Sequence, residues 1–331
     1  MAEAVLVAGG AGYIGSHVCK ALKLAGYLPV TLDNMTAGRR DFVKFGPLVE
    51  ACVSNSEAVA ETVQRYGIKA VIDLAGSIEV GESVRDPLKY HENNYARKIP
   101  FLRALQAGGV KAVVFSSTAA VYGEPQSTPI PESHPLLPKN PYGQSKLAYE
   151  YLLRDFHAAG GPAWMALRYF NAAGASPDGD IGESHEPETH LIPLACMAQL
   201  GRAPALGVFG NDYPTPDGTA VRDYIHVLDL AQAHVLAVEA LLSGKPSGQY
   251  NLGNGVGNSI GQVLACFEKL GLPVPHSYKP RRAGDPSSLV ADSSAAKTQL
   301  GWKPQYAALE DIILSAHRWH AAQPHSTSKA S

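Results

Sequence analysis

The chain has 331 residues, 45% of them hydrophobic, and its 28 lysines and arginines nearly balance 30 aspartates and glutamates, for a net charge of −2. This composition is typical of a folded globular protein, and at about 100–200 residues per domain the length allows one large or two ordinary domains. No Lys/Arg cluster is longer than two. The sequence therefore excludes the broad basic surface that extended nucleic acids or anionic membranes require.

The four cysteines are widely spread, without Cys-x-x-Cys or Cys/His ligand spacing. The cysteine pattern therefore predicts neither a disulfide framework nor a zinc site, and we expect no bound metal. The apolar run at residues 4–8 reaches Gly9 too soon for a secretory signal or a membrane span of about 20 residues. We expect a cytoplasmic protein with buried, reduced thiols.

In the first half of the chain, short apolar runs alternate with segments of helical periodicity. We predict strands at residues 4–8, 28–32, 70–74, 112–115 and 164–169, and helices near 14–25, 56–66, 95–108 and 142–158. This alternation predicts a parallel sheet covered on both faces. The glycine-rich loop directly after the first strand favours a doubly wound, Rossmann-like α/β fold over a closed barrel.

Beyond about Ala172 the connections become rich in Pro, Gly and Asp. Further helices are predicted near 190–200, 228–243, 259–270 and 308–320. They are too few and too interrupted to predict a second independent core. We expect a smaller C-terminal α/β cap that shares the surface of the first domain.

A glycine-rich loop, Gly9-Gly-Ala-Gly-Tyr-Ile-Gly15, follows the first predicted strand and opens a helix. This position places backbone N–H groups and a helix N-terminus where a pyrophosphate can bind. The second strand then leads to Asp33, 18 residues after Gly15, where a carboxylate accepts hydrogen bonds from an adenosine ribose. An anion there repels a 2′-phosphate, so NAD is favoured over NADP. Arg39-Arg40 keeps NADP as a minority alternative.

A tyrosine and a lysine, Tyr142 and Lys146, are spaced i and i+4, which places them on one face of a helix. A neighbouring ammonium lowers the pKa of a phenol from about 10, so that tyrosine acts as a base closer to neutral pH. Ser116, Ser117 and Thr118 lie just past a predicted strand, at the edge where ligands of open α/β sheets bind. Together these features predict a dinucleotide-dependent enzyme.

These motifs resemble the extended short-chain dehydrogenase/reductase family and, within it, the UDP-glucose 4-epimerases. The resemblance runs from Val5 to about Ala316 and is most specific at residues 9–17, 80–83, 141–146, 168–171, 209–215, 221–226, 250–253 and 281–285. It implies an NAD-binding domain over residues 1–175 and a mainly substrate-binding domain over 176–331, with some elements returning to the first domain. It also implies a homodimer formed through helices near 95–108 and 142–158.

The resemblance implies that UDP-glucose and UDP-galactose are interconverted through a 4-keto sugar that rotates before reduction on its other face. Tyr142 would take the proton of the sugar 4-hydroxyl, Lys146 would lower the tyrosine pKa and hold the nicotinamide ribose, and Thr118 would bond to the reacting oxygen. The implied cofactor contacts are Gly9, Gly12, Tyr13, Ile14, Gly15, Asp33, Asn34, Cys52, Val53, Ala75, Gly76, Asn93, Ser116, Tyr142, Lys146 and Phe170.

The implied substrate contacts are Thr118, Tyr142, Asn171, His190, Leu191, Phe209, Arg222, Tyr224, Arg282, Asp285 and Leu289. Arg222 and Arg282 suit the diphosphate, because guanidinium bonds to it with charge assistance. Asp285 suits a ribose hydroxyl.

Four positions depart from the pattern of well-known family members. Cys52 stands in place of an aspartate that contacts the adenine amino group, and Ile78 in place of a lysine near the pyrophosphate. Both predict looser NAD binding. His190 replaces an asparagine beside the substrate diphosphate, for which we expect a neutral hydrogen-bonding role. Leu289 replaces the residue that admits or excludes N-acetylated sugars; its intermediate size predicts a preference for UDP-glucose and UDP-galactose.

Related activities stay open at this point: epimerisation of UDP-pentoses or UDP-N-acetylhexosamines, and decarboxylation of UDP-glucuronate. A 4,6-dehydratase needs an acid and base after the strand-end hydroxyl, where this chain has Ala119-Ala120. A non-catalytic NAD-binding scaffold is a distant alternative, because it would be free to lose Tyr142 or Lys146.

Overall fold

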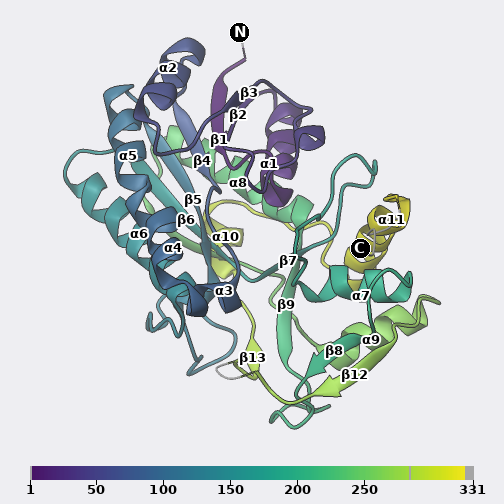
Figure 1. Cartoon of the computed structure of the whole chain (residues 1–331). Coiled ribbons are helices and arrows are strands. Elements are labelled where there is room, and N and C mark those ends of the chain that lie inside the picture. Colours follow the sequence, from purple (N-terminus) through teal and green to yellow (C-terminus); the bar gives the residue numbers. More distant parts are fainter. Residues whose placement is uncertain (1, 283–284, 325–331) are drawn as a thin grey trace.

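A seven-stranded sheet forms the centre of the larger part of the molecule (Figure 1). The computed structural model describes residues 2–282 and 285–324. The strand order is β10-β6-β5-β4-β1-β2-β3, and all neighbours are parallel. The strands are β1 Ala4–Ala8, β2 Leu28–Asp33, β3 Leu48–Glu50, β4 Ala70–Asp73, β5 Ala112–Thr118, β6 Ala163–Tyr169 and β10 Gly248–Leu252. The order reverses at β1, which is where ligands bind in doubly wound sheets.

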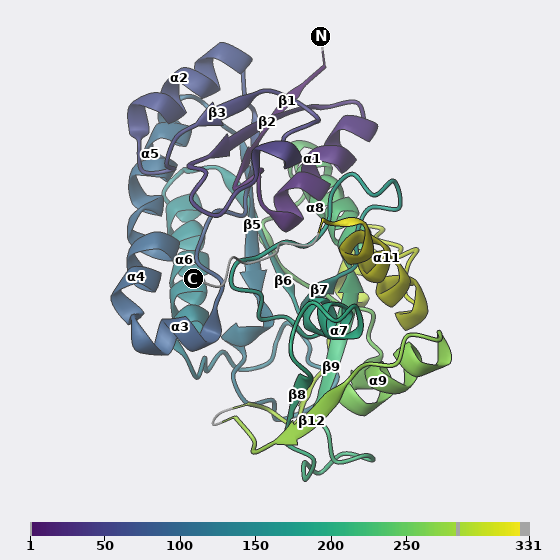
Figure 2. The same cartoon turned by 45° about the vertical axis from the view of Figure 1, so that its right-hand side comes forward.

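Helices cover both faces of this sheet, as Figures 1 and 2 show. One face packs against α1 (Tyr13–Leu24) and α8 (Val227–Leu242), with α10 (Ser294–Gln299) beside β10. The other packs against α2 (Ser56–Tyr66), α5 (Lys98–Ala107) and α6 (Pro141–Ala158). The fold is therefore the predicted doubly wound α/β type, with two separate hydrophobic clusters on the two faces of one sheet.

Local sequence explains where the site-bearing elements begin. Every residue of β1 is buried, as expected of an apolar strand covered on both faces. Helix α6, which carries Tyr142, starts with Pro141 at its first position, and the Asn140 side chain caps it by accepting a hydrogen bond from Gly143 N at 2.9 Å. The cap fixes the first turn and thus the direction of the Tyr142 side chain.

The remaining elements form a smaller part, at the lower right of Figure 1. It contains the strands β7 Asn171–Ala173, β9 Val221–His226, β11 Gly257–Ser259 and β13 Ser288–Leu289 in one sheet, and β8 Leu206–Phe209 with β12 His276–Lys279 in another. Its helices are α7 Leu191–Gln199, α9 Ile260–Lys269 and α11 Leu309–Ala322. These helices bury a hydrophobic cluster of their own around Ile192, Phe267 and Ile313. The expectation that the second half lacks its own core is therefore wrong.

Most predicted elements of the first half are confirmed, with four differences. Strand β3 was not predicted. Strand β5 continues through Thr118, so Ser116–Thr118 end the strand instead of following it. The predicted helix at 95–108 begins only at Lys98, after a π-helical turn η2 (Glu92–Ala96). Two short helices that precede it were not predicted, α3 (Val80–Arg85) and α4 (Pro87–His91). The 3₁₀ turns η1 (Arg40–Phe42) and η3 (Ala119–Val121) were not predicted either. Within the part of the chain that the structure describes, no helix is both long and apolar enough to span a membrane.

Candidate active site

The glycine loop connects β1 to α1, and three of its glycines differ in what a side chain at their position would meet. Gly9 has a φ of +77°, and a Cβ there would lie 2.8 Å from Ala75 N. A Cβ on Gly15 would lie 2.1 Å from Gly9 O, so this glycine lets the helix pack on the loop. A Cβ on Gly12 meets only Gly9 O, at 3.4 Å, so no protein atom forbids a side chain there. The bare Gly12 backbone, at the N-terminus of α1, is instead suited to the close approach of a phosphate.

Asp33 ends β2 beside this loop, and its carboxylate is largely buried. Its Oδ2 accepts a hydrogen bond from Ala11 N at 3.0 Å, and its Oδ1 accepts one from Met35 N at 2.9 Å. The carboxylate is thereby fixed next to the glycine loop. Arg39 and Arg40, which suit a 2′-phosphate, are paired with Asp41 and Glu50 respectively. This arrangement favours a ribose with a free 2′-hydroxyl.

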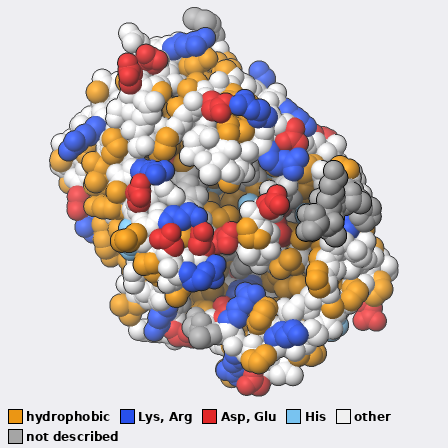
Figure 3. Space-filling view, viewed as in Figure 1, with side chains coloured by type: hydrophobic (Ala, Val, Ile, Leu, Met, Phe, Trp, Pro, Cys, Tyr) orange, Lys and Arg blue, Asp and Glu red, His pale blue; other side chains and the backbone are white. Residues whose placement is uncertain are grey.

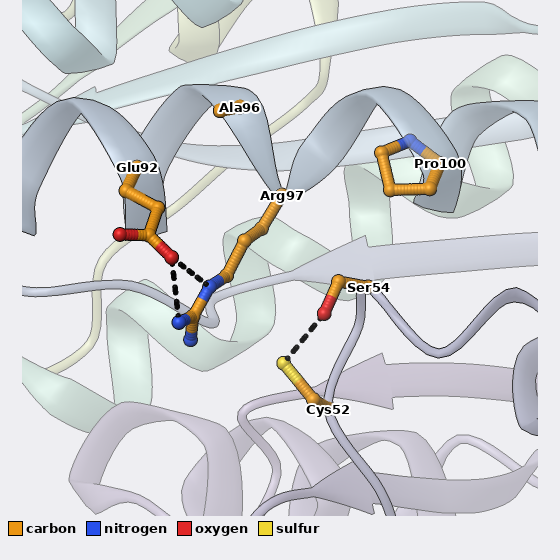
Figure 4. A pocket seen from close by; sticks show the side chains of 6 residues that line it. All are labelled: Cys52, Ser54, Glu92, Ala96, Arg97 and Pro100. Atoms are coloured by element: carbon orange, nitrogen blue, oxygen red, sulfur yellow. Dashed lines mark hydrogen bonds and ion pairs between the residues drawn. The ribbon is translucent and has the colours of Figure 1, made fainter.

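An open pocket of about 560 Å³ lies close to the end of β2 (Figure 4). Ala51 N donates to Asp33 O at 3.0 Å, and the next residue in the chain, Cys52, lines the pocket. Its lining residues are Cys52, Ser54, Glu92, Ala96, Arg97 and Pro100. Ser54 Oγ donates to Cys52 Sγ at 3.2 Å, and Arg97 pairs with Glu92 at 2.8 Å. Burial raises the pKa of Cys52, but the Ser54 hydrogen bonds and the Arg97 charge outweigh it and lower that pKa.

Tyr142 and Lys146 lie together at the carboxyl end of β5. Lys146 Nζ is 5.9 Å from the centre of the Tyr142 ring and donates to Ser116 O at 2.9 Å. Thr118 also reaches Tyr142, through a side-chain hydrogen bond that lowers the phenol pKa. Ser116 Oγ is hydrogen-bonded to the hydroxyl of Tyr169, on the neighbouring strand β6. A phenol, an ammonium and a hydroxyl thus converge at one sheet edge.

A buried polar network supports Lys146. Lys98 Nζ donates to Asp73 Oδ1 and to Ala75 O, both at 2.7 Å, and Tyr149 donates to Asp73 Oδ2 at 3.1 Å. Burial and the Lys98 charge lower the pKa of Lys146 to about 7, while Asp73 opposes them. Residue-pattern reasoning missed this network, although a lysine at the start of the apolar helix α5 was a signal for it.

A second set of predicted residues gathers around β9. Arg222 Nη2 pairs with Asp285 Oδ1 at 3.0 Å, and its Nη1 donates to Pro286 O at 2.9 Å. The Arg282 guanidinium stacks 3.9 Å from the centre of the Phe209 ring. These contacts hold two cations and an acceptor on neighbouring segments, a donor set suited to a nucleoside diphosphate.

Leu289 connects this region to the catalytic edge. It pairs in register with Arg222 on β9 and packs, like Phe170, against the cluster that contains Ala119 and Leu147. Ala119 follows Thr118 directly, and Leu147 follows Lys146. A side chain of intermediate size therefore stands beside the candidate catalytic residues.

Comparison with known proteins decides the family. The model of the NAD dependent epimerase/dehydratase family matches residues 5–253. The chain belongs to this family.

Its relatives are similar over nearly their whole length. The UDP-glucose 4-epimerase of Rhizobium leguminosarum bv. trifolii is 50% identical over 320 residues, covering 96% of this chain and 98% of the relative. The crystal structure of UDP-glucose 4-epimerase from Brucella ovis in complex with NAD matches with a TM-score of 0.93 and 47% identity, covering 96% of this chain and 98% of that one. The epimerase from Stenotrophomonas maltophila with bound NAD and formylated UDP-arabinopyranose matches at 0.94 and 39%, covering 97% and 98%.

The remaining predicted cofactor residues of this epimerase/dehydratase chain fall into two groups: side chains that pack into the fold, and asparagines that bond to nearby segments of the chain. Tyr13 donates to Gly174 O at 2.6 Å, and Val53 is buried in the core, so both side chains hold the fold. Ile14 packs partly into the core beside the sheet. Asn93 donates to Ser77 Oγ at 3.0 Å and so fixes the chain after β4, near Ala75 and Gly76. Asn34 is exposed, and its Oδ1 accepts from Thr36 N at 3.1 Å.

Contacts around Tyr142 and Lys146 bear on their expected electrostatic pairing. Burial raises the pKa of Tyr142, and the Thr118 hydrogen bond is what opposes this rise. Lys146 is not among the groups that shift the phenol pKa; its Nζ donates to Ser116 O and lies 5.0 Å from the centre of the Phe115 ring. That Lys146 depresses the Tyr142 pKa therefore stays a prediction.

On the substrate side, Tyr224 is buried in the second core and pairs in register with Asn171, so its ring packs against protein atoms. His190 occupies the N-cap position of α7, directly before Leu191, without a capping hydrogen bond from its side chain. Burial lowers the pKa of His190, but hydrogen bonds to Glu183 and Glu188 outweigh it and raise that pKa to about 10. This contradicts the neutral role expected for His190. The acidic partners were missed, although the spacing of Glu183, His185, Glu188 and His190 was visible in the sequence.

Proposed function

We propose that this protein interconverts UDP-glucose and UDP-galactose with NAD as a cofactor that is regenerated in each cycle. The carrying observation is the convergence of Tyr142, Lys146 and Thr118 at the carboxyl edge of β5 in a sheet whose first loop is built for a pyrophosphate. Curated relatives of this chain are UDP-glucose 4-epimerases. Bound NAD supplies a nicotinamide ring that takes a hydride from the sugar C4 and returns it.

Tyr142 is the proposed base. Its phenolate oxygen takes the proton of the sugar 4-hydroxyl, and after inversion the same oxygen gives a proton back. Thr118 holds the reacting oxygen within reach of the phenol. Lys146 has a pKa of about 7, so its amine exchanges a proton at neutral pH and can restore the protonation of the site between half-reactions.

Inversion requires firm nucleotide contacts and weak sugar contacts. Arg222 and Arg282 are proposed to bind the diphosphate, and Asp285 a ribose hydroxyl. Arg222 is already oriented by Asp285 and by Pro286 O, which reduces the entropy lost on binding. Near the sugar, Leu289 adds no hydrogen-bonding group, so a keto sugar is free to turn. Asn171, His190, Leu191, Phe209 and Tyr224 complete the proposed substrate region.

We also propose that residues 1–175 bind NAD and that residues 176–331 mainly bind the substrate. Elements α8, α10 and β10 lie after residue 175 yet pack on the large sheet, so the assignment concerns binding and not chain continuity. The proposed cofactor contacts are those of the glycine loop, Asp33, Cys52 and the ends of β4 and β5. The Asp33 geometry and the pairing of Arg39 and Arg40 support NAD over NADP.

A homodimer is proposed through the helices of the large part, α5 and α6. Its support is apolar surface on α6 and on the helices that pack against it: Leu88 is 79% exposed, Val84 65% and Tyr151 42%. In Figure 3 hydrophobic side chains gather on the left, over these helices. Light scattering after gel filtration tests this proposal, and Tyr151→Arg with Leu88→Arg should yield a monomer. All four cysteines are free thiols, which suits the proposed cytoplasmic location.

The deciding experiment is incubation of the purified protein with a panel of UDP-sugars, followed by separation of the products. The panel contains UDP-glucose, UDP-galactose, their N-acetyl forms, UDP-xylose and UDP-glucuronate, each with and without added NAD. Conversion of UDP-galactose to UDP-glucose as the fastest reaction supports the proposal. Exclusive turnover of a pentose, or release of CO₂ from UDP-glucuronate, assigns a related activity instead.

A further inference from the structure

Two glutamates and two histidines meet in the segment that joins β7 to α7. Glu183, His185, Glu188 and His190 each place one ligand atom so that all four atoms lie within 4.8 Å of one another. They alternate along the chain as Glu-x-His-x-x-Glu-x-His. Cysteine spacing gave no hint of this group, because it contains no cysteine.

Four nitrogen–oxygen separations in this cluster lie near the edge length of a tetrahedron around a metal ion, with His190 facing Oε1 and His185 facing Oε2 of Glu188. His190 Nδ1 lies 3.0 Å from Glu183 Oε1 and 2.9 Å from Glu188 Oε1, while His185 Nδ1 lies 3.3 Å from Glu183 Oε1 and 3.5 Å from Glu188 Oε2. Four ligands at about 2.0–2.2 Å from a zinc ion are about 3.3–3.6 Å apart. The observed spacings need only small adjustments to accept the ion.

Hydrogen bonds alone leave this cluster unsatisfied. The carboxylates of Glu183 and Glu188 are 4% and 7% exposed. Among residues 2–282 and 285–324, the buried atoms His185 Nδ1 and Glu188 Oε2 have no hydrogen-bond partner, although they lie 3.5 Å apart. His185 Nδ1 therefore has ion-pair contacts to Glu183 Oε1 and Glu188 Oε2 but no well-formed hydrogen bond, and a shared metal ion would give it and Glu188 Oε2 a direct partner.

The charge and the ligand types select zinc. Two carboxylates and a divalent cation sum to zero with neutral imidazoles, so the ion replaces the protons that two histidinium rings would carry. Magnesium and calcium prefer sites made of oxygen, whereas imidazole with carboxylate suits zinc. Four protein ligands leave no open position, which is typical of a structural site.

The position of the cluster shows what the ion would do. The His185 ring packs edge-on against Tyr13 of the glycine loop, with ring centres 6.1 Å apart, and Trp319 Nε1 of α11 donates to Glu183 O at 2.8 Å. The last member, His190, stands at the N-cap position of α7 immediately before Leu191. A metal here would join the segment to the glycine loop on one side and to α7 on the other.

We propose that Glu183, His185, Glu188 and His190 bind one structural zinc ion that fixes the segment between β7 and α7. This inference does not depend on the substrate or on the reaction. It goes beyond the expectation of no bound metal, which rested on cysteine spacing.

The test is metal analysis of the full-length protein, purified through a tag without histidines and without chelators. We expect about one zinc per chain by mass spectrometry of the dissolved metal, retained on dialysis, and in a crystal an anomalous peak at the zinc edge between the four side chains. The variant His185→Gln/His190→Gln should lose this zinc, while the matched control His157→Gln, an exposed histidine in α6, should keep it.

Two further measurements keep the test decisive. Circular dichroism must show that the double variant is folded; if it is not, Glu188→Gln replaces it in the same comparison. Zinc chloride added to metal-stripped protein should raise the melting temperature of the parent and of His157→Gln but not of the ligand variant. Zinc below about 0.1 per chain after reconstitution, or equal zinc in parent and folded ligand variant, would overturn the proposal.

Discussion

Lys98 Nζ lies 2.7 Å from Asp73 Oδ1 in an ion pair whose side chains are 1% and 0% exposed. The pair sits under the candidate site, since the Lys98 charge lowers the pKa of Lys146 and Asp73 raises it. Asp73 ends β4 and Lys98 begins α5, so the pair joins the sheet to the helix beside the edge where Tyr142 stands. Because the pair is buried, its loss should change the stability of the fold as well as the pKa of Lys146.

Removing one member of this pair should destabilise the fold strongly. Lys98→Met leaves the Asp73 carboxylate buried without its cation, at an expected cost of about 3–5 kcal/mol in the free energy of unfolding. The double variant Lys98→Met/Asp73→Asn, which removes both charges, should lose less. Urea denaturation of both variants provides the comparison. A single variant more stable than the double variant would contradict the buried-charge explanation.

The pKa of Lys146 predicts a pH-dependent stability. Folding lowers this pKa from 10.5 to about 7, chiefly by burial, so between these values the unfolded chain binds more protons than the folded one. Stability therefore rises with pH across that window. Relative to Lys146→Met, the parent should gain roughly 2 kcal/mol between pH 7 and pH 9. A difference in unfolding free energy that stays constant over this range would show that Lys146 keeps its ordinary pKa.

The pocket beside Cys52 predicts weak discrimination of the cofactor base. A thiol is a poor acceptor for the adenine amino group, Arg97 offers only donors, and the Glu92 carboxylate in the same pocket is paired with Arg97. The parent should therefore bind NAD and its hypoxanthine analogue within about threefold of each other, whereas Cys52→Asp should favour NAD by about tenfold. Calorimetric titration measures both, with Cys196→Ser as a buried control. Strong preference for NAD in the parent would contradict this reading.

Looser cofactor binding is a separate expectation from Cys52 and Ile78. The Ile78 side chain is 41% exposed and offers no charge to a pyrophosphate. Part of the NAD should therefore be lost on gel filtration, and Ile78→Lys should raise its retention. Full occupancy of the parent after gel filtration would contradict this expectation.

Leu289 should control the choice between hexoses and their N-acetyl forms. It packs beside the segments that hold Thr118 and Lys146, so its size sets the space near the sugar. Leu289→Ala should raise kcat/KM for UDP-N-acetylgalactosamine relative to UDP-galactose, and Leu289→Tyr should lower this ratio. Steady-state kinetics on both sugars gives the values. Equal ratios in all three proteins would remove Leu289 from substrate selection.

The sequence predicted the fold best where local pattern and tertiary contact agree. Strands such as β1 are continuous apolar runs, and their burial on both faces is visible in composition alone. Strand β3 has three residues, none of them buried, and so carries no apolar signal. The second sheet depends on pairing between distant segments, such as Asn258 with Arg222, which no local pattern contains.

The same limit applies to the candidate site. Spacing placed Tyr142 and Lys146 on one helix face, but the direction of the ammonium depends on Ser116 O, which lies on another element. The cluster of Glu183, His185, Glu188 and His190 lies outside helices and strands except for a capping position, so periodicity gave no reason to expect its side chains to converge.

The central claim is that Tyr142 supports oxidation and reduction at the sugar C4 with return of the same hydride. Proton NMR of UDP-galactose incubated with the protein in D₂O tests it most directly, since a hydride held on a cofactor does not exchange with solvent. We predict UDP-glucose that carries hydrogen, not deuterium, at C4, and no product from a Tyr142→Phe variant that still binds NAD. Deuterium at C4, or unchanged turnover by Tyr142→Phe, would contradict it.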